Sequence, residues 1–244
     1  MNQKQEHIKQ QINNATVNHH APKSVIFEQT HTNTKKRLRM VKYNTSPDEG
    51  NVLPNLLGIT DEQLLHQSEL EGFLYAAMYL SERLSPDTRF DARYICNIHR
   101  LALSHLYKFA GKYRSVNMSK GGFVFPSAIY IDQAMTELER DFLNKLPQTY
   151  SNTDTLIRDV ASVHAELLFI HPFREGNGRT ARLLANLMVQ KQGYPPLHFE
   201  YITDTHFTEY VCAVQSAADR NYRPMEEIIR KIFSVNTSPI TPDK

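Results

Sequence analysis

The feature that most restricts the fold of this chain is a polar segment between two helical stretches. It occupies residues 171–182 and reads HPFREGNGRTAR. Apolar side chains recur at helical spacing before it, over 153–170, and after it, over 178–192, so we expect a helix–loop–helix. Two glycines and three arginines make the segment too polar for a core helix. Its charged residues are also too regularly placed for an ordinary surface loop. It therefore predicts a ligand site at the junction of two helices.

The remainder of the middle of the chain is also helical in pattern. Apolar residues return every three or four positions over 60–84, 90–109, 131–145, 203–219 and 223–234. The sequence therefore predicts an all-α fold, a compact helical bundle.

One stretch departs from the helical pattern. Residues 115–131 alternate between polar and apolar, are rich in Val, Phe, Ile and Tyr, and contain a Gly-Gly pair. This is typical of a β-hairpin. We expect a single hairpin beside the helices.

Composition limits the class of protein. The chain has 244 residues, of which 41% are hydrophobic, and no apolar run approaches the ~20 residues of a membrane helix. The N-terminus lacks the apolar stretch of a secretory signal. Cys96 and Cys212 stand at no motif spacing, which favours a reducing compartment. A cytoplasmic protein without a membrane segment is expected.

Charge and composition divide the chain. Residues 1–59 form a polar, basic arm and connector that we expect to be partly disordered, residues 60–234 form the folded domain, and residues 235–244 form a flexible tail. The first 44 residues carry a net charge of +6 and the rest −4. The arm lacks the interleaved aromatic residues that stack on bases, so nucleic acid is not the expected partner.

The junction segment has the chemistry of an anion site. A helix beginning near Gly178 offers unpaired N–H groups and a positive dipole end, where phosphates bind. Gly176 and Gly178 let the backbone approach a ligand, and Asn177 adds a side-chain donor. Arg179 and Arg182, three positions apart, could both reach a polyphosphate.

A metal ligand and a base complete this set. Glu175 offers the hard oxygen that Mg²⁺ prefers. His171, at the mouth of the loop, is placed to take a proton from an attacking hydroxyl. Together these residues predict phosphoryl or nucleotidyl transfer. A metal hydrolase is disfavoured, because His164 and His171 have no HxH or HxxxH partner set.

The junction segment resembles the signature of the Fic (filamentation induced by cyclic AMP) domain family, HPFx(D/E)GNGRxxR, and matches it at every specified position. The resemblance continues upstream in AGKYRSVNMSKGGF (110–123) and downstream in ANLMVQKQGYPP (185–196). It extends over about residues 60–234. It implies a compact all-α core with a β-hairpin flap.

The resemblance also implies an activity. Members transfer AMP from ATP to a Ser, Thr or Tyr hydroxyl of a protein, and self-modification is expected. By that analogy His171 would be the general base and Glu175 would hold Mg²⁺. Binding of the ATP phosphates would fall to Gly176, Asn177, Gly178, Arg179 and Arg182. The flap residues that clamp the target by strand addition would be Lys120, Gly121, Gly122 and Phe123.

Regulation in the family implies one more residue, an inhibitory Glu in the pattern (S/T)xxxE(G/N). Glu49, in TSPDEG, fits the letters but follows Pro47, which suits a helix poorly. Glu71 precedes Gly72, but Gln67 stands where Ser or Thr belongs. Three alternatives therefore stay open: an internal inhibitory Glu, a toxin restrained by a separate antitoxin, and a nucleotide-binding module without activity. A homodimer is also left open.

Overall fold

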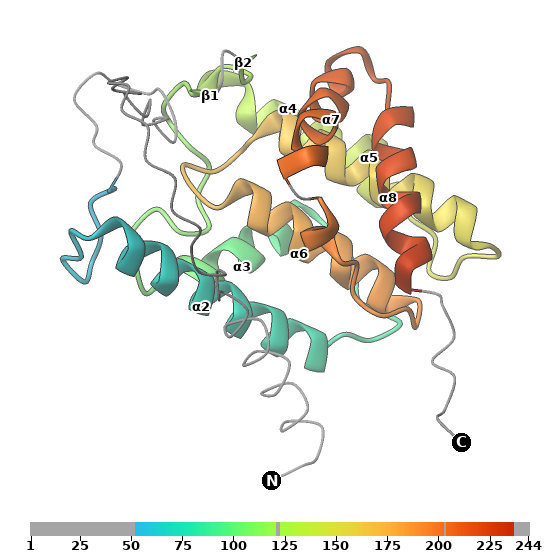
Figure 1. Cartoon of the computed structure of the whole chain (residues 1–244), viewed down its shortest axis with the longest axis horizontal. Helices are drawn as coiled ribbons and strands as arrows, with labels where there is room; N and C mark the ends of the chain where they lie inside the picture. Colours follow the sequence, from blue (N-terminus) through green and yellow to red (C-terminus); the bar gives the residue numbers. More distant parts are fainter. Residues whose placement is uncertain (1–51, 121–122, 203, 237–244) are drawn as a thin grey trace, which may run out of the picture. The chain divides into compact units, whose positions relative to one another are not determined.

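The computed structural model describes residues 52–120, 123–202 and 204–236, all within the second of two units of the chain, Val41–Lys244 (Figure 1). Its α-helices are α2 (Glu62–Glu82), α3 (Ala92–Leu103), α4 (Ile131–Asp141), α5 (Thr153–Ile170), α6 (Asn177–Lys191), α7 (Asp204–Gln215) and α8 (Arg223–Asn236). Short 3₁₀ turns cover Ala128–Tyr130, Leu143–Lys145, Phe199–Tyr201 and Ser216–Asp219. The predicted all-α class with one hairpin is confirmed.

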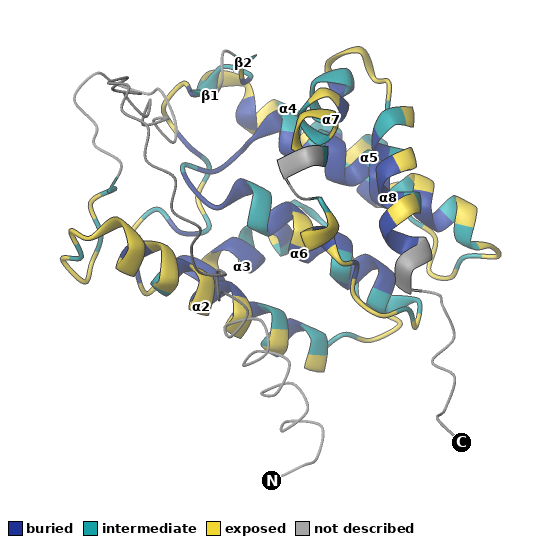
Figure 2. Ribbon diagram, in the orientation of Figure 1, coloured by how far each residue is buried: buried dark blue, intermediate teal, exposed yellow. Residues whose placement is uncertain are grey.

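Helices α5 and α6 form the centre of this unit. Helices α2 and α3 pack against α6 from one side, and α7 and α8 pack against α5 from the other (Figure 1). Buried residues are concentrated along α5 and α6 (Figure 2). The loop between these two helices, which carries the signature, is therefore held by two extensively buried helices.

Several predicted helices are shorter in the structure than in the sequence pattern. The stretch predicted over 90–109 ends at Leu103, and the chain continues in tight turns. Leu106 and Tyr107 are still buried there, and the Leu106 carbonyl accepts a hydrogen bond from the N–H of Leu56. The apolar spacing beyond Leu103 therefore reflects side chains that pack into the core from a turn, and not a continued helix. Similarly, the 131–145 and 203–219 stretches each finish in a 3₁₀ turn.

The hairpin is small. Strands β1 (Ser119–Lys120) and β2 (Phe123–Val124) pair antiparallel, with Ser119 opposite Val124 and Lys120 opposite Phe123. The Phe125 N–H donates to the Met118 carbonyl, which extends the pairing by one step. The predicted turn residues Gly121 and Gly122 lie outside the described residues.

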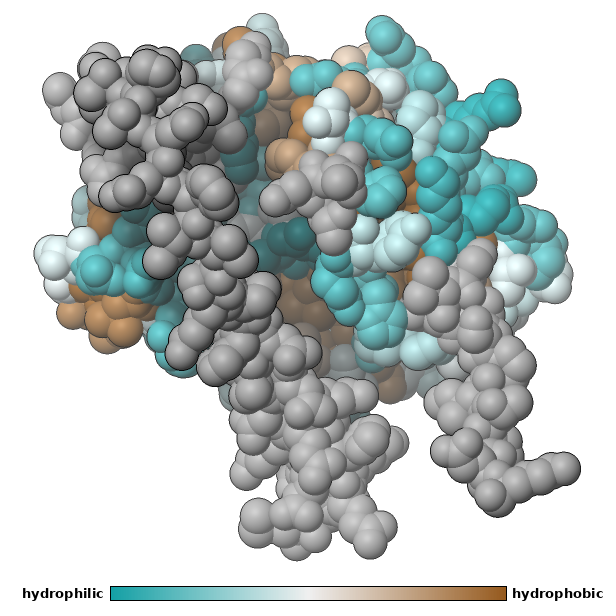
Figure 3. Space-filling view, in the orientation of Figure 1, coloured by the Kyte–Doolittle hydropathy of each residue, from teal (hydrophilic) through white to brown (hydrophobic). Residues whose placement is uncertain are grey.

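The described surface is mostly polar in this orientation, with a hydrophobic patch over the segment that precedes α2 (Figure 3). Leu56 and Leu57 in this segment are 50% and 59% exposed. Among the described helices, none combines the length and the hydrophobicity that crossing a membrane requires.

Candidate active site

Helix α5 ends at an unusual residue. His171 follows its last turn with φ 53° and ψ 56°, the left-handed conformation that glycine usually adopts at helix ends. A non-glycine residue there is strained, and such strain is found most often at functional sites. Its N–H still donates to the Leu167 carbonyl, and Pro172 then prevents the helix from continuing. The chain turns sharply at His171 as a result.

The loop is closed by Asn177, the first residue of α6. Its side-chain oxygen accepts from the Phe173 N–H at 2.8 Å, and its side-chain nitrogen donates to the Phe173 carbonyl at 2.7 Å. Both side-chain atoms are therefore used inside the loop. The side-chain nitrogen carries a second N–H, and this donor and the backbone N–H at the start of α6 are what Asn177 can offer an anion.

A buried histidine on α3 packs against the loop and hydrogen-bonds to its backbone. His99 Nε2 lies 2.9 Å from the Glu175 carbonyl, and His99 Nδ1 accepts from the Gly111 N–H at 2.8 Å. The Nε2 atom must therefore carry the proton and donate. The ring stacks on Phe173 at 3.9 Å between centroids. Burial lowers the pKa of His99 to about 4, so the ring stays neutral and keeps this tautomer at neutral pH.

Arg179 points into the protein. Its Nη2 donates to Glu69 on α2 at 2.7 Å and to Glu175 at 3.1 Å. Glu69 is 1% exposed and also accepts from the Tyr107 hydroxyl at 2.6 Å. One guanidinium is thus shared by two buried carboxylates, and it fixes α2 to the start of α6.

His171 has the properties of a neutral base. Its Nδ1 lies 3.0 Å from the Leu168 carbonyl, which assigns the proton to Nδ1 and makes Nε2 the acceptor nitrogen. Phe125 of the hairpin stacks on the ring at 3.8 Å between centroids. Burial, with smaller effects from the positive charges of Arg114 and Lys120, lowers the pKa of His171 to about 3. The imidazole is therefore neutral throughout the physiological pH range.

Glu175 suits a hard cation that takes most of its ligands elsewhere. It is 3% exposed, and its Oε1 accepts from the Gly176 N–H and from Arg179. No group of three or more His, Cys, Asp or Glu side chains gathers among the described residues. A single carboxylate is consistent with Mg²⁺ that is bound mainly by substrate phosphates and water.

The signature loop lies within a stretch that matches a known protein family. Residues 89–189 match the model of the Fic/DOC family. That stretch of the chain, which contains the signature loop, is a Fic domain. The predicted family is confirmed.

Named relatives of this Fic domain are longer proteins. The chain is 29% identical over 182 residues to the protein adenylyltransferase Fic of Nematostella vectensis, a match that covers 69% of this chain and 41% of that protein. It is 28% identical over 179 residues to the protein of the same name from Drosophila willistoni, covering 73% and 34%. The chain thus spans well under half the length of these relatives.

Solved structures share the fold. The Fic domain of the Bep8 effector from Bartonella sp. 1-1C superposes with a TM-score of 0.67 at 17% identity, covering 81% of this chain and 98% of that one. The BepC effector of Bartonella tribocorum, whose crystal structure contains AMPPNP, gives a TM-score of 0.62 at 23% identity, covering 76% and 93%.

The two signature arginines of this Fic domain lie in different surroundings. Arg179 is held inside by Glu69 and Glu175, whereas Arg182 is exposed and makes no ion pair within the described part of the chain. The Arg182 guanidinium lies over the first turn of α6, with Nη2 3.9 Å from the position that a Cβ on Gly178 would occupy. Arg182 is therefore open to a ligand without losing a carboxylate partner, whereas Arg179 holds both carboxylates through Nη2.

Of the two inhibitory candidates, only Glu71 is described in the structure, and it has no contact with Arg182 there. Glu71 is exposed on α2 and accepts from Gln67 at 3.0 Å. Glu49 lies outside the described residues. Of the flap residues, Lys120 and Phe123 face each other across the hairpin.

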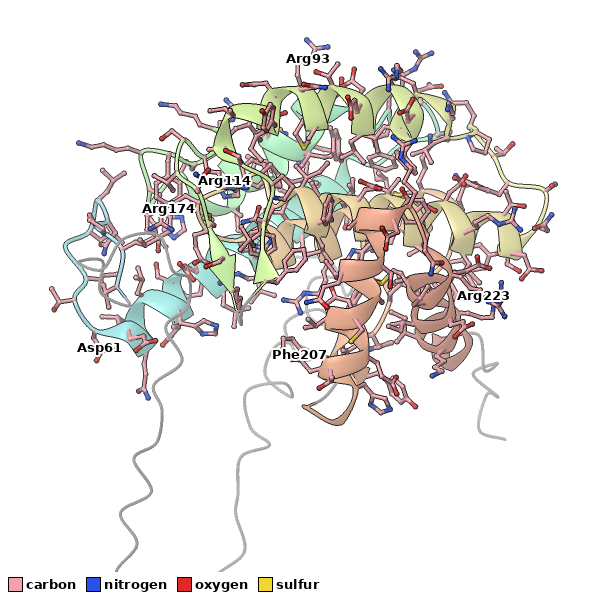
Figure 4. The ribbon with its side chains drawn as sticks, turned by 90° about the horizontal axis from the view of Figure 1, so that it is seen from above. Asp61, Arg93, Arg114, Arg174, Phe207 and Arg223 are labelled. Atoms are coloured by element: carbon pink, nitrogen blue, oxygen red, sulfur yellow. The ribbon has the colours of Figure 1, made fainter. Side chains whose placement is uncertain are left out.

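Four residues of the site were missed in the sequence: Glu69, His99, Tyr107 and Arg114. The first three lie in helical or apolar patterns with no motif around them. Arg114 stands in the upstream stretch that resembles the family, and that stretch was the one available signal. Figure 4 shows Arg114 and Arg174 beside the hairpin.

Proposed function

We propose that this Fic domain transfers AMP from ATP to a hydroxyl side chain of a protein. One observation carries the proposal: His171 is a buried, neutral imidazole with a fixed tautomer, held between the hairpin and the N-terminus of α6. A base of this kind is in the correct protonation state at neutral pH. The names of the relatives support adenylyl transfer, and the AMPPNP-bound neighbour supports a nucleotide co-substrate.

The reaction balances with these groups. His171 Nε2 takes the proton of the target hydroxyl as its oxygen attacks the α-phosphorus of ATP. The bond between that phosphorus and the bridging oxygen to the β-phosphate breaks, and pyrophosphate leaves. Glu175 would hold Mg²⁺, which neutralises phosphate charge when bound. The N–H groups at the start of α6 and Arg182 would bind the phosphate oxygens.

Features of the hairpin support a protein as the second substrate. Val124 on β2 is 71% exposed, and Ile129 and Tyr130 just beyond it are 77% and 57% exposed. A short two-stranded hairpin also leaves backbone groups on its outer edges for strand addition. The target would bind through these apolar side chains and the strand edge.

Regulation is proposed to come from outside the described residues. Arg182 has no carboxylate partner among them, so the inhibitory Glu would be Glu49 or would belong to an antitoxin protein. The free cysteines Cys96 and Cys212 support the cytoplasm as the location. A homodimer stays a prediction.

Intact-mass analysis after incubation with ATP and Mg²⁺ tests the proposal, with the chain itself and a library of peptides as acceptors. We expect a gain of one AMP in the wild type, none in His171→Ala, and an unchanged gain in His198→Ala, whose histidine is on the surface. Omission of Mg²⁺ should abolish the gain. A wild type that binds ATP but modifies no acceptor would contradict the proposal and favour a nucleotide-binding module.

The same assay separates the regulatory alternatives. A sharp increase in Glu49→Gly would identify an internal inhibitor, with Glu71→Gly as the matched comparison. Equal activity in the wild type and both variants would leave inhibition by a separate antitoxin as the remaining alternative. That protein would then be sought by co-purification.

A further inference from the structure

Arg114 is a buried cation whose side chain binds only backbone carbonyls among the described residues. The residue is 4% exposed, and its guanidinium makes no ion pair within the described part of the chain. Nε donates to the His171 carbonyl at 2.7 Å, Nη1 to the Val116 carbonyl at 2.7 Å and Nη2 to the Pro126 carbonyl at 2.6 Å. One planar group therefore joins three separate segments.

The first segment is the end of α5. The last turn of this helix contains no basic residue, and its final carbonyls need partners from elsewhere. Besides the His171 carbonyl, Arg114 approaches the Ile170 carbonyl at 3.4 Å, and its own N–H donates to the Pro172 carbonyl at 2.8 Å. A cation at the negative end of a helix dipole is favourable. Arg114 thus stabilises the strained turn at His171.

The other two segments are the arms of the hairpin. Val116 precedes β1, and Pro126 follows β2 directly after Phe125, whose ring stacks on His171. Because a single guanidinium holds both arms and the His171 carbonyl, the hairpin and the base are fixed relative to each other. Lysine could not replace it, since a point-like ammonium lacks the planar fork that reaches three carbonyls at once.

We propose that Arg114 is a positioning residue that couples the hairpin to His171, so that an ordered hairpin and a correctly placed base occur together. The expected effect on kcat rests on the proposed adenylyl transfer. The coupling of the hairpin to His171 does not. Arg114 touches no reacting atom in this arrangement and acts through His171 and Phe125.

Charge and geometry can be separated experimentally. The charged groups that lower the pKa of His171 are Arg114 and Lys120, both from the hairpin side, in addition to burial. Arg114→Lys retains the charge and loses the fork, whereas Arg114→Met loses both. Arg158→Met, an exposed arginine on α5, is the matched control.

Three readouts are measured on the full chain. Amide hydrogen exchange at Phe125 and His171, whose N–H groups are bonded in the structure, should rise about tenfold or more in both Arg114 variants. NMR titration of His171 should show a raised pKa in Arg114→Met and a value near the wild type in Arg114→Lys. The kcat for AMP transfer should fall about tenfold or more in both, with KM for ATP within about twofold.

The exchange and kcat results decide the inference, and the His171 titration shows which variant retains the charge. Wild-type exchange and kcat in Arg114→Lys would overturn the inference, as would unchanged exchange in a folded Arg114→Met. If Arg114→Met does not fold, Arg114→Lys alone decides through exchange and kcat. Faster exchange in the variants together with no AMP transfer by the wild type would retain the coupling and reject the proposed function instead.

Discussion

The buried contact between Glu69 and Tyr107 offers a quantitative test of how α2 is held to the site. Glu69 accepts one hydrogen bond from the Tyr107 hydroxyl and one from Arg179, and it is 1% exposed. Burial and the neighbouring Glu69 raise the pKa of Tyr107, so its hydroxyl remains protonated and donates. Replacing either residue removes a hydrogen bond to a charged group, which is worth about 1.5–3 kcal/mol.

The charge balance decides the size of the effect. Loss of a whole buried ion pair partner typically costs about 3–5 kcal/mol, because a charge is left without compensation. Arg179 would keep Glu175 after Glu69→Gln, so no uncompensated charge arises. We therefore expect Glu69→Gln to lower the free energy of unfolding by about 1.5–3 kcal/mol, the value for one lost hydrogen bond to a charged group rather than for a broken ion pair.

Urea unfolding followed by far-ultraviolet circular dichroism is the assay, since the chain contains no tryptophan for fluorescence. Tyr107→Phe should cost about 1.5–3 kcal/mol, and the double variant should cost less than the sum, because a phenylalanine ring at this position needs no acceptor. Glu71→Gln, on the exposed face of α2, is the control and should change stability by less than about 0.5 kcal/mol. A Glu69→Gln variant as stable as the control would refute the reasoning, since Glu69 would then not act as a buried, charged acceptor.

Two further perturbations follow from the same region of the fold. Gly176 has φ 75° and a Cβ there would lie 2.9 Å from a core atom, whereas Gly193 has φ 84° and open space around it. Gly176→Ala should therefore destabilise by clearly more than Gly193→Ala, whose cost is the ~1–2 kcal/mol of left-handed strain, and equal urea midpoints would contradict this. Burial lowers the pKa values of His99, His164 and His171 to about 4, 3 and 3, so the unfolded chain binds protons more readily below pH 6.5. The free energy of unfolding should fall as pH falls from about 6.5 toward 4, by up to ~1.4 kcal/mol per pH unit for each imidazole. His164→Gln should reduce that slope by the share of one imidazole.

The sequence predicted what depends on local pattern. Apolar spacing located the helices that flank the loop, and alternation with a Gly-Gly pair located the hairpin. The motif also identified His171 and the helix N-terminus as neighbours, because they are separated by only a few residues. These inferences needed no knowledge of tertiary structure.

What could not be predicted depends on contacts between distant segments. Glu69 reaches Arg179 across 110 positions, and nothing in the pattern of α2 distinguishes Glu69 from the exposed Glu71. Likewise, a spacing of three placed Arg179 and Arg182 on neighbouring faces of a helix, but only the packing of α2 shows that one points inward. Side-chain direction in a helix is set by what the helix packs against.

The signature itself divides into residues that build the loop and residues that face a ligand. Asn177 closes the loop on the Phe173 backbone, and Phe173 is buried against His99. None of these three interactions uses the His171 imidazole, whose neighbours include the Leu168 carbonyl and Phe125. The loop should therefore keep its shape when the imidazole is removed. For that reason His171→Ala tests chemistry, whereas Asn177→Ala, which leaves a buried N–H and carbonyl without partners, should disrupt the architecture and lose nucleotide binding and stability together.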